Sequence, residues 1–154
     1  MKDPENLFLG THKREVVASR GVVITNHPLA SSTGVEMFAL GGNAFDAAVA
    51  SLFALTVVEP MMVSVFGAGF FTLRTADGRI LTIDNYAMAP KAATEDMYEP
   101  VERRLPGQYL FETVGRRNMV GHLSVATPGA LKGWEYVVEE YGRLSLTEVM
   151  EPAI

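Results

Sequence analysis

The chain has 154 residues with 13 basic and 18 acidic side chains, a formal net charge of -5 and no cysteine. Its composition, 48% hydrophobic and 20% charged, is typical of a globular domain with a sizeable core. The acidic balance and the lack of a cluster of basic residues argue against a nucleic-acid partner. The absence of cysteine excludes disulfide bonds and thiolate zinc sites.

Residues 1–15 combine charged and turn-forming side chains and are expected to form an arm laid over the surface. They contain no apolar core of the kind that a signal peptide needs, so we expect a cytoplasmic protein. Export is the alternative, with a leader that is truncated or replaced.

The first predicted elements are a strand and a helix. The stretch VVASRGVVIT is rich in β-branched residues and predicts a strand over Gly21–Thr25, followed by Asn26 as a helix cap. A helix is predicted over Pro28–Leu40, with its proline in the first turn and an apolar face formed by Leu29, Thr33, Met37 and Leu40. Gly34 on this helix would allow close approach of a neighbour.

The next predicted helix, Ala44–Val58, is the centre of the fold. It is apolar on all sides and too short to span a bilayer, which indicates a buried core helix. Asn43 is expected to cap it, and Asp46 meets the positive helix end. Glu59-Pro60 ends it, since the residue before proline avoids the α conformation.

A hairpin is predicted over Phe70–Asn85, because hydrophobic alternation flanks Asp77-Gly78, a pair typical of a type I′ turn. Pro90–Leu110 is expected to be loop-like, with a short helix near Ala93–Tyr98 and a turn at Pro106-Gly107.

The last predicted elements are a short strand over His122–Ala126 and a helix opened by Thr127-Pro128. Gly142 is expected to end that helix, and another begins near Leu146. The helical face consists of Leu131, Trp134, Val138 and Tyr141, which makes the tryptophan a core residue rather than a ligand platform.

Several residue types that often carry chemistry lack the necessary context. His12, His27 and His122 have no acidic or thiolate partner at metal-ligand spacing, so no metal site is expected. Ser64 has no nucleophile-elbow motif around it, and Asp46 and Glu59 lie roughly 20 Å apart at opposite ends of one helix. The glycines Gly67 and Gly69 follow a helix and precede a strand, the reverse of the dinucleotide-binding order. No cofactor is expected.

Three stretches of the sequence resemble motifs of the γ-glutamyltransferase family. GGNAFDAAVASLFALTVVEP is similar to its signature G-G-N-A-x-D-A-A-x-A followed by V-x-E-P, and IDNYAMAPKAATEDMY is similar to its D-x-R-E-x-A-P segment. SVATPGALKGWEYVVEEYGRLSLTEVMEPAI resembles the family's V-P-G-x-x-x-G, Y-G and P-A-I run. The resemblance covers about residues 20–154.

The resemblance implies an α+β fold: the N-terminal part of an αββα N-terminal nucleophile hydrolase sandwich, with a buried central helix and an antiparallel hairpin. Residues 16–154 are then one incomplete domain. Such enzymes are precursors that cut themselves, and their threonine nucleophile becomes a new N-terminus whose amine acts as base. That threonine lies beyond the P-A-I segment, so no catalytic residue is assigned in this chain.

The function implied is that of a non-catalytic N-terminal portion of an amidohydrolase or acyltransferase that acts on a γ-glutamyl or other small amide. Its partners would be that substrate and the remaining C-terminal, small-subunit part, with a homo-oligomer left open and no membrane span. The alternative is a free-standing, catalytically inactive binding protein on the same scaffold.

Two departures from the family pattern bear on the substrate. In Asp84-Asn85-Tyr86-Ala87-Met88-Ala89-Pro90, Tyr86 occupies the position of the arginine that grips the α-carboxylate of the γ-glutamyl group. A phenol donates one hydrogen bond and carries no positive charge at neutral pH. The loop Val63–Phe70 also loses three of the glycines in S-G-x-G-G-G-G-F, and we interpret it as a tight structural loop.

Overall fold

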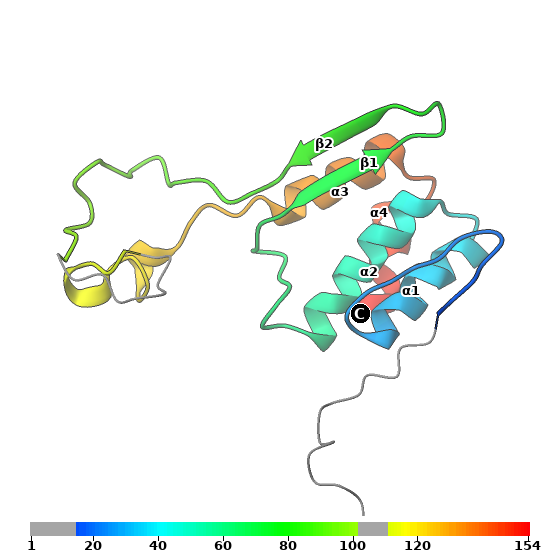
Figure 1. Cartoon of the computed structure of the whole chain (residues 1–154), viewed down its shortest axis with the longest axis horizontal. Helices are drawn as coiled ribbons and strands as arrows, with labels where there is room; N and C mark the ends of the chain where they lie inside the picture. Colours follow the sequence, from blue (N-terminus) through cyan, green and yellow to red (C-terminus); the bar gives the residue numbers. More distant parts are fainter. Residues whose placement is uncertain (1–14, 102–110) are drawn as a thin grey trace, which may run out of the picture.

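The computed structural model describes residues 15–101 and 111–154. In Figure 1 the helices α1–α4 and the hairpin β1–β2 form the body, and the described residues between β2 and α3 extend away from it. The α+β expectation is confirmed. The arm over residues 1–15 stays a prediction, since only Glu15 of it is described, and the predicted turn at Pro106-Gly107 lies outside the described residues.

Helix α1 (Pro28–Ala39) is confirmed, but its cap and its buried face differ from the prediction. His27, not Asn26, is the N-cap, and its Nδ1 accepts a hydrogen bond from the Leu29 N–H at 3.3 Å. Leu29 and Leu40 are exposed, and the buried residues are Ala30, Thr33, Gly34 and Met37. Small residues face α2 because the two helices lie close: a Cβ at position 34 would come within 2.4 Å of Ser51 Oγ.

The strand predicted over Gly21–Thr25 is wrong. This segment has no regular secondary structure, and β1 and β2 are the members of the sheet within the described residues. The Thr25 N–H donates to Ser31 Oγ (3.1 Å), and the Thr25 hydroxyl donates to the His27 carbonyl (2.7 Å). A β-branched composition favours extended backbone, but a strand also needs a partner for its hydrogen bonds.

Helix α2 (Ala44–Val58) has the predicted bounds. Asn43 Oδ1 accepts hydrogen bonds from the N–H groups of Phe45 (2.8 Å) and Asp46 (3.3 Å), and Asp46 Oδ2 accepts from the Asn43 N–H (2.7 Å). This reciprocal pair is a capping box. At the other end Glu59 is the C-cap, and its N–H donates to the Leu55 carbonyl at 2.8 Å.

Strands β1 (Phe70–Arg74) and β2 (Ile80–Asp84) form the predicted hairpin, with Thr72 opposite Thr82. Its turn is not type I′, which needs positive φ at two residues. Within this fully described hairpin Gly78 alone has positive φ (89°), and its N–H donates to the Thr75 carbonyl at 2.9 Å. This is the longer loop that ends in a left-handed glycine.

Helix α3 (Ala130–Tyr141) begins after the Gly129 cap and ends at Gly142, and α4 (Leu146–Met150) follows, capped by Ser145. The short 3₁₀ turn η4 (Glu151–Ala153) completes the described chain. Trp134 is 4% exposed, which confirms it as a core residue, whereas Leu131 is largely exposed.

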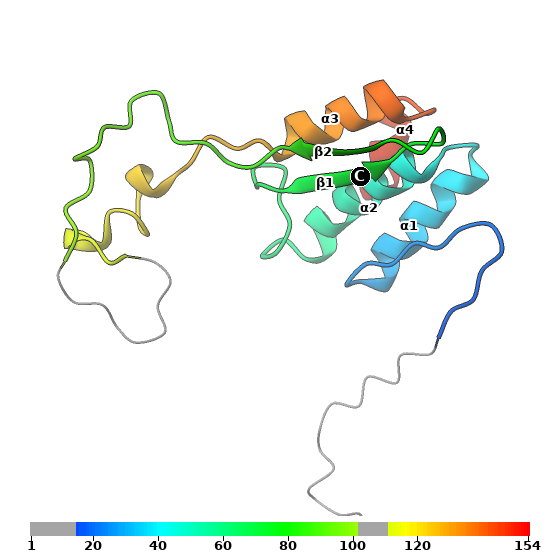
Figure 2. The same ribbon diagram turned by 45° about the horizontal axis from the view of Figure 1, so that its top comes forward.

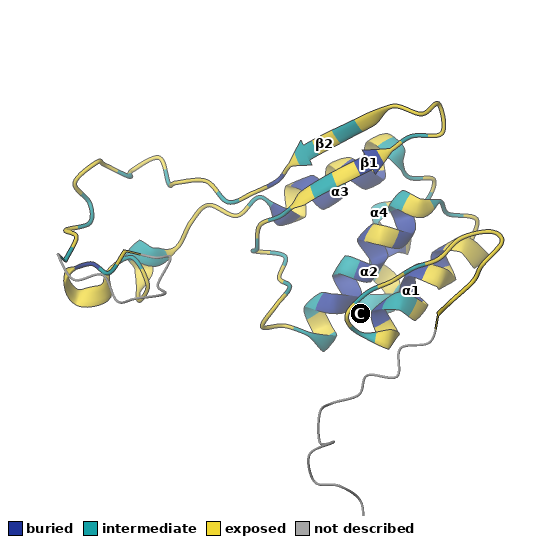
Figure 3. Cartoon of the chain, viewed as in Figure 1, coloured by how far each residue is buried: buried dark blue, intermediate teal, exposed yellow. Residues whose placement is uncertain are grey.

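The core lies where α2, α3 and α4 meet the inner face of the hairpin. Phe53 and Trp134 pack edge to face with ring centroids 5.1 Å apart, and Val49, Val137 and Val149 are fully buried. Phe71, Leu73, Leu81 and Ile83 face this core, while the alternate strand residues are exposed (Figure 3). Figure 2 shows the two strands of the hairpin running alongside α3, while α2 and α3 also contact each other directly through Phe53 and Trp134.

Two further sequence predictions fall on the extended segment and are wrong. Ala93–Tyr98 forms isolated turns, in which the Ala93 N–H bonds to the Pro90 carbonyl (2.9 Å), rather than a helix. His122–Ser124 is a 3₁₀ turn (η3), like Val114–Arg116 (η2), rather than part of a strand. Little apolar surface covers these residues, and short helices depend on such packing. In the part of the chain that the structure describes, no helix is long and apolar enough to cross a membrane.

Asp46 connects three parts of the body. Its carboxylate is fully buried and, besides the Asn43 N–H, accepts hydrogen bonds from the N–H groups of Arg143 (3.1 Å) and Leu144 (3.3 Å) beyond α3. Asn43 Nδ2 donates in turn to the Tyr141 carbonyl at 2.7 Å. Two neighbouring cap residues of α2 therefore fix the end of α3.

We expect Asp46→Ala to lower the free energy of unfolding by about 3 kcal/mol, because three backbone donors lose a buried charged acceptor. Urea unfolding of the chain, followed by the fluorescence of its single tryptophan, measures this change. Asp96→Ala, at an exposed position, is the control and is expected to change stability by less than about 0.5 kcal/mol. Equal effects of the two substitutions would contradict the role of Asp46.

Candidate functional site

The candidate site lies at the open end of the hairpin, where Tyr86 follows β2 by two residues. Tyr86 is 56% exposed, and its ring stacks on the ring of Phe70 with centroids 5.3 Å apart and planes at 16°. The Tyr86 N–H donates to Asp84 Oδ1 at 3.0 Å. The side chain is therefore oriented by both strands of the hairpin.

Reciprocal backbone hydrogen bonds hold the main chain on both sides of Tyr86. Before it, the Asn85 N–H donates to the Gly69 carbonyl (3.2 Å), and the Gly69 N–H donates to the Asn85 carbonyl (3.4 Å). After it, the N–H groups of Met88 and Thr127 each donate to the other's carbonyl, at 2.9 and 2.8 Å. The two-residue span Tyr86–Ala87 is thus fixed at both ends.

Helix α3 lies directly against this main chain because two of its residues lack side chains. A Cβ at Gly129 would be 2.5 Å from the carbonyl oxygens of Asn85 and Tyr86, and a Cβ at Gly133 would be 2.4 Å from Asn85 Cβ. Real Cβ atoms do not approach other heavy atoms this closely. The start of α3 therefore fixes the position of the main chain at Asn85 and Tyr86 by direct contact.

Asn85 is the buried member of the site, only 6% exposed. Its Nδ2 donates to the Ala130 carbonyl at 3.5 Å, and its Oδ1 has no hydrogen-bond partner among the described residues. A buried acceptor without a partner costs about 1–3 kcal/mol. The carboxamide is therefore held mainly by packing, not by hydrogen bonds.

A hollow of about 640 Å³ surrounds Tyr86, lined by Phe70, Met88, Lys132 and Tyr136 among others. Lys132 is the one cation among its described lining residues. Lys132 Nζ lies 2.7 Å from Glu135 Oε2, and the Lys132 side chain is 80% exposed. The hydrogen bond that Lys132 donates to Glu135 raises the pKa of Lys132. The charge of this cation is thus already paired.

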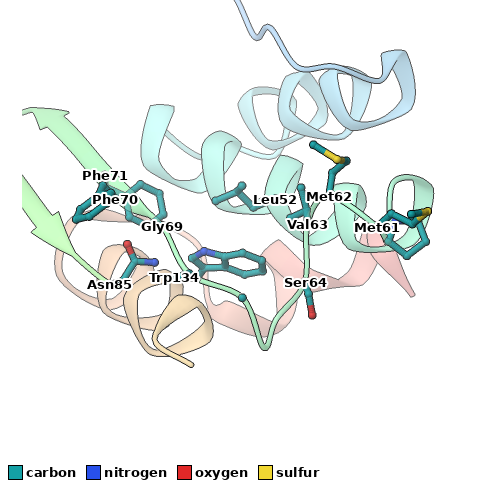
Figure 4. Close-up of a pocket in the computed structure, with 13 residues that line it drawn as sticks. Leu52, Met61, Met62, Val63, Ser64, Gly69, Phe70, Phe71, Asn85 and Trp134 are labelled. Carbon is teal, nitrogen blue, oxygen red and sulfur yellow. The ribbon is translucent and has the colours of Figure 1, made fainter. Parts of the chain in front are cut away.

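The loop Val63–Phe70, which contains Gly67 and Gly69, borders a second hollow of about 380 Å³ between α2 and β1 (Figure 4). Figure 4 shows Trp134 between Asn85 on one side and Val63 and Ser64 on the other. The loop is closed by the Gly67 N–H, which donates to the Ser64 carbonyl (2.9 Å), and the Gly67 carbonyl accepts from the Ala130 N–H (3.2 Å). Asn85 lines both hollows.

The described histidine, serine and acidic residues for which no catalytic or metal-binding role was expected lie at helix ends and in turns. His27 caps α1, and Ser64 Oγ accepts a hydrogen bond from the Phe66 N–H at 3.1 Å. Asp46 and Glu59 lie at opposite ends of α2, His122 lies in η3, and His12 lies outside the described residues. Among the residues that are described, no three His, Asp or Glu side chains form a group able to hold a metal ion.

The sequence analysis singled out Tyr86, whose role stays a prediction, and did not single out Asn85, Gly129 or Gly133. The spacing of Gly129 and Gly133 was a usable signal. Residues four apart lie on one face of a helix, and two glycines there leave that face without side chains. No local signal showed that this face would lie against Asn85.

The chain is similar to known proteins in sequence and in structure. Residues 30–154 match the family described as Gamma-glutamyltranspeptidase. The chain is 53% identical over 142 residues to the Acylase ACY 1 proenzyme of Pseudomonas sp. (strain V22), covering 92% of this chain and 25% of that protein. It is 39% identical over 139 residues to the Glutathione hydrolase proenzyme of Pseudomonas sp. (strain A14), covering 90% and 23%.

The structural comparison agrees. The gamma-glutamyltranspeptidase of Helicobacter pylori is similar with a TM-score of 0.77 and 32% sequence identity, covering 91% of this chain and 38% of that one. The chain therefore spans about a quarter of the length of the curated relatives that it matches.

The contact between α3 and Asn85-Tyr86 predicts unequal effects of two glycine substitutions. We expect Gly129→Ala to destabilise the chain by about 2 kcal/mol or more, because the new methyl group collides with two backbone oxygens that cannot move independently. Gly69→Ala is the matched control on the other side of Asn85, where the added Cβ has 3.9 Å of room. Thermal unfolding measures the stability of both variants. A similar loss of stability in the two would contradict a close contact between α3 and the main chain at Tyr86.

Proposed function

Because the chain belongs to the gamma-glutamyltranspeptidase family, we propose that it is the N-terminal part of a self-processing amidohydrolase that cleaves a small amide whose acyl group is not γ-glutamyl. Relatives named as proenzymes support synthesis as a precursor. In this proposal the chain contributes one wall of the acyl-binding site, and the remaining part of the protein contributes the nucleophile.

The observation that carries the proposal is the placement of Tyr86. It stands where the family motif has its carboxylate-binding arginine, and both sides of it are fixed by backbone hydrogen bonds. The position is therefore as well ordered as a specificity residue requires, but the side chain is a neutral ring. Lys132 does not reproduce the missing guanidinium, because an ammonium lacks the planar fork that holds a carboxylate by two hydrogen bonds, and Glu135 competes for its charge.

The surroundings of Tyr86 favour an uncharged acyl chain. Phe70, Met88 and Tyr136 present apolar surface to the hollow, and the Tyr86 hydroxyl can donate one hydrogen bond. A charged α-carboxylate would lose water there without gaining a bidentate partner. The 53% identity to a protein named an acylase, against 39% to one named a glutathione hydrolase, supports the same preference.

The chemistry proposed is acyl transfer through an ester. The hydroxyl of a new N-terminal threonine in the remaining part of the protein attacks the amide carbonyl, and the α-amine of that threonine takes the hydroxyl proton. The amine product leaves with a proton, and water then cleaves the ester to release the acid. Residues of this chain orient the acyl group and exclude water from it.

The test compares two nitroanilides with acyl chains of five carbons, pentanoyl and γ-glutamyl, on the complete protein. We expect a higher kcat/KM for the pentanoyl compound. We expect Tyr86→Arg to raise kcat/KM for the γ-glutamyl compound about tenfold or more, since a bidentate charge-assisted pair contributes on the order of 1.5–3 kcal/mol. Release of nitroaniline measures both rates.

Two further variants separate charge from geometry. Tyr86→Lys adds a positive charge without the planar fork and is expected to give a smaller gain than Tyr86→Arg. Tyr86→Phe keeps the ring and is expected to retain the pentanoyl activity. Efficient turnover of the γ-glutamyl compound by the unmodified protein would contradict the proposed specificity.

A further inference from the structure

We propose that Asn85 is a positioning residue: the packing of its carboxamide against Gly133 of α3 sets the location of Tyr86 and with it the acyl specificity. This inference rests on the proposed function of Tyr86. It assigns a role to a residue that is itself buried and does not contact the substrate.

The main chain couples the position of Asn85 to that of Tyr86. Asn85 and Tyr86 are adjacent in the chain, and the main chain after Tyr86 is already fixed by the Met88–Thr127 pair. On the other side, Asn85 is paired with Gly69, which continues the hairpin register one pair beyond Phe70 and Asp84. A displacement of Asn85 must therefore be taken up within Tyr86 and Ala87.

The contact with Gly133 of α3 fixes Asn85. A Cβ at position 133 would lie 2.4 Å from Asn85 Cβ, 2.6 Å from Cγ and 2.8 Å from Nδ2. The whole Asn85 side chain thus occupies the space that a residue other than glycine would fill. The position of α3 is set independently, by the Ala130 N–H bond to Gly67 and by the burial of Trp134 in the core.

Hydrogen bonds hold the Asn85 carboxamide only weakly. Its single hydrogen bond is long, 3.5 Å to the Ala130 carbonyl, and Oδ1 has no partner among the described residues. Because packing and not hydrogen bonding holds the side chain, a change of volume at position 133 shifts Asn85 together with Gly69, its main-chain partner, and breaks no side-chain network.

The experiment is an exchange of volume between the two positions in the complete protein. Gly133→Ala pushes Asn85 away, and adding Asn85→Gly removes the three atoms that lie nearest to the new methyl group. The readout is the ratio of kcat/KM for the pentanoyl and γ-glutamyl nitroanilides. We expect Gly133→Ala to change this ratio by roughly tenfold, since small misplacements of positioning groups have effects of this size, and the double variant to restore it to within about threefold.

Gly34→Ala is the matched control for lost stability. Its added Cβ would come within 2.4 Å of Ser51 Oγ, so it disturbs packing between α1 and α2 as severely, but away from Tyr86. We expect it to lower the melting temperature and leave the ratio unchanged. A ratio that is unaffected by Gly133→Ala, or equally affected by Gly34→Ala, would overturn the positioning role.

A second variant and a structural measurement test the same role in two other ways. If Gly133→Ala does not fold, Asn85→Ala removes the carboxamide without a collision; a changed ratio supports the role and an unchanged ratio overturns it. If the unmodified protein hydrolyses neither anilide, the proposed function fails, and crystal structures of Asn85→Ala and the unmodified protein decide the inference separately. A displaced Tyr86 main chain supports the positioning role, and an unmoved one contradicts it.

Discussion

The buried carboxylate of Asp46 is the interaction on which the rest of the structure depends. It closes the capping box of α2 with Asn43 and accepts hydrogen bonds from the backbone beyond α3. Gly142 is close enough that a Cβ there would meet Asp46 Oδ1 at 2.5 Å, so the chain passes directly over the carboxylate. One side chain thereby fixes the start of the central helix and the end of α3, and the angle between these two helices determines where α3 meets the hairpin.

The site at Tyr86 follows from that arrangement. With α3 held at its far end by Asp46 and at its near end by Gly67, the glycines at positions 129 and 133 lie against the last residues of the hairpin. The hairpin then presents Tyr86 beside a largely apolar hollow. The core and the residue proposed to set the specificity are thus parts of one packing arrangement, in which the hydrogen bonds of Asp46 hold α3 and the two glycines lie against the main chain at Asn85 and Tyr86.

Elements with local signals were predicted well from the sequence, and elements that need a distant partner were not. The Asn43 cap, the proline after Glu59 and the Asp77-Gly78 turn are signals within a few residues. They gave α2 its correct bounds and the hairpin its correct position, although the predicted type of turn was wrong. Three segments have suitable compositions but form no regular element. Gly21–Thr25 and His122–Ala126 have no partner strand among the described residues, and Ala93–Tyr98 forms isolated turns. Tyr86 was singled out through a motif, and its role stays a prediction. The contact of Asn85 with α3 joins residues more than 40 positions apart and has no local signature.

The intact mass of the protein as its natural source makes it tests the central claim most directly. A self-processing acylase of this family predicts two chains derived from one precursor, with the sequence described here near the start of the larger chain and threonine as the first residue of the smaller one. Sequencing the new N-terminus would then identify the nucleophile. A single species of 154 residues would contradict the account and would favour a free-standing, catalytically inactive binding protein on the same scaffold.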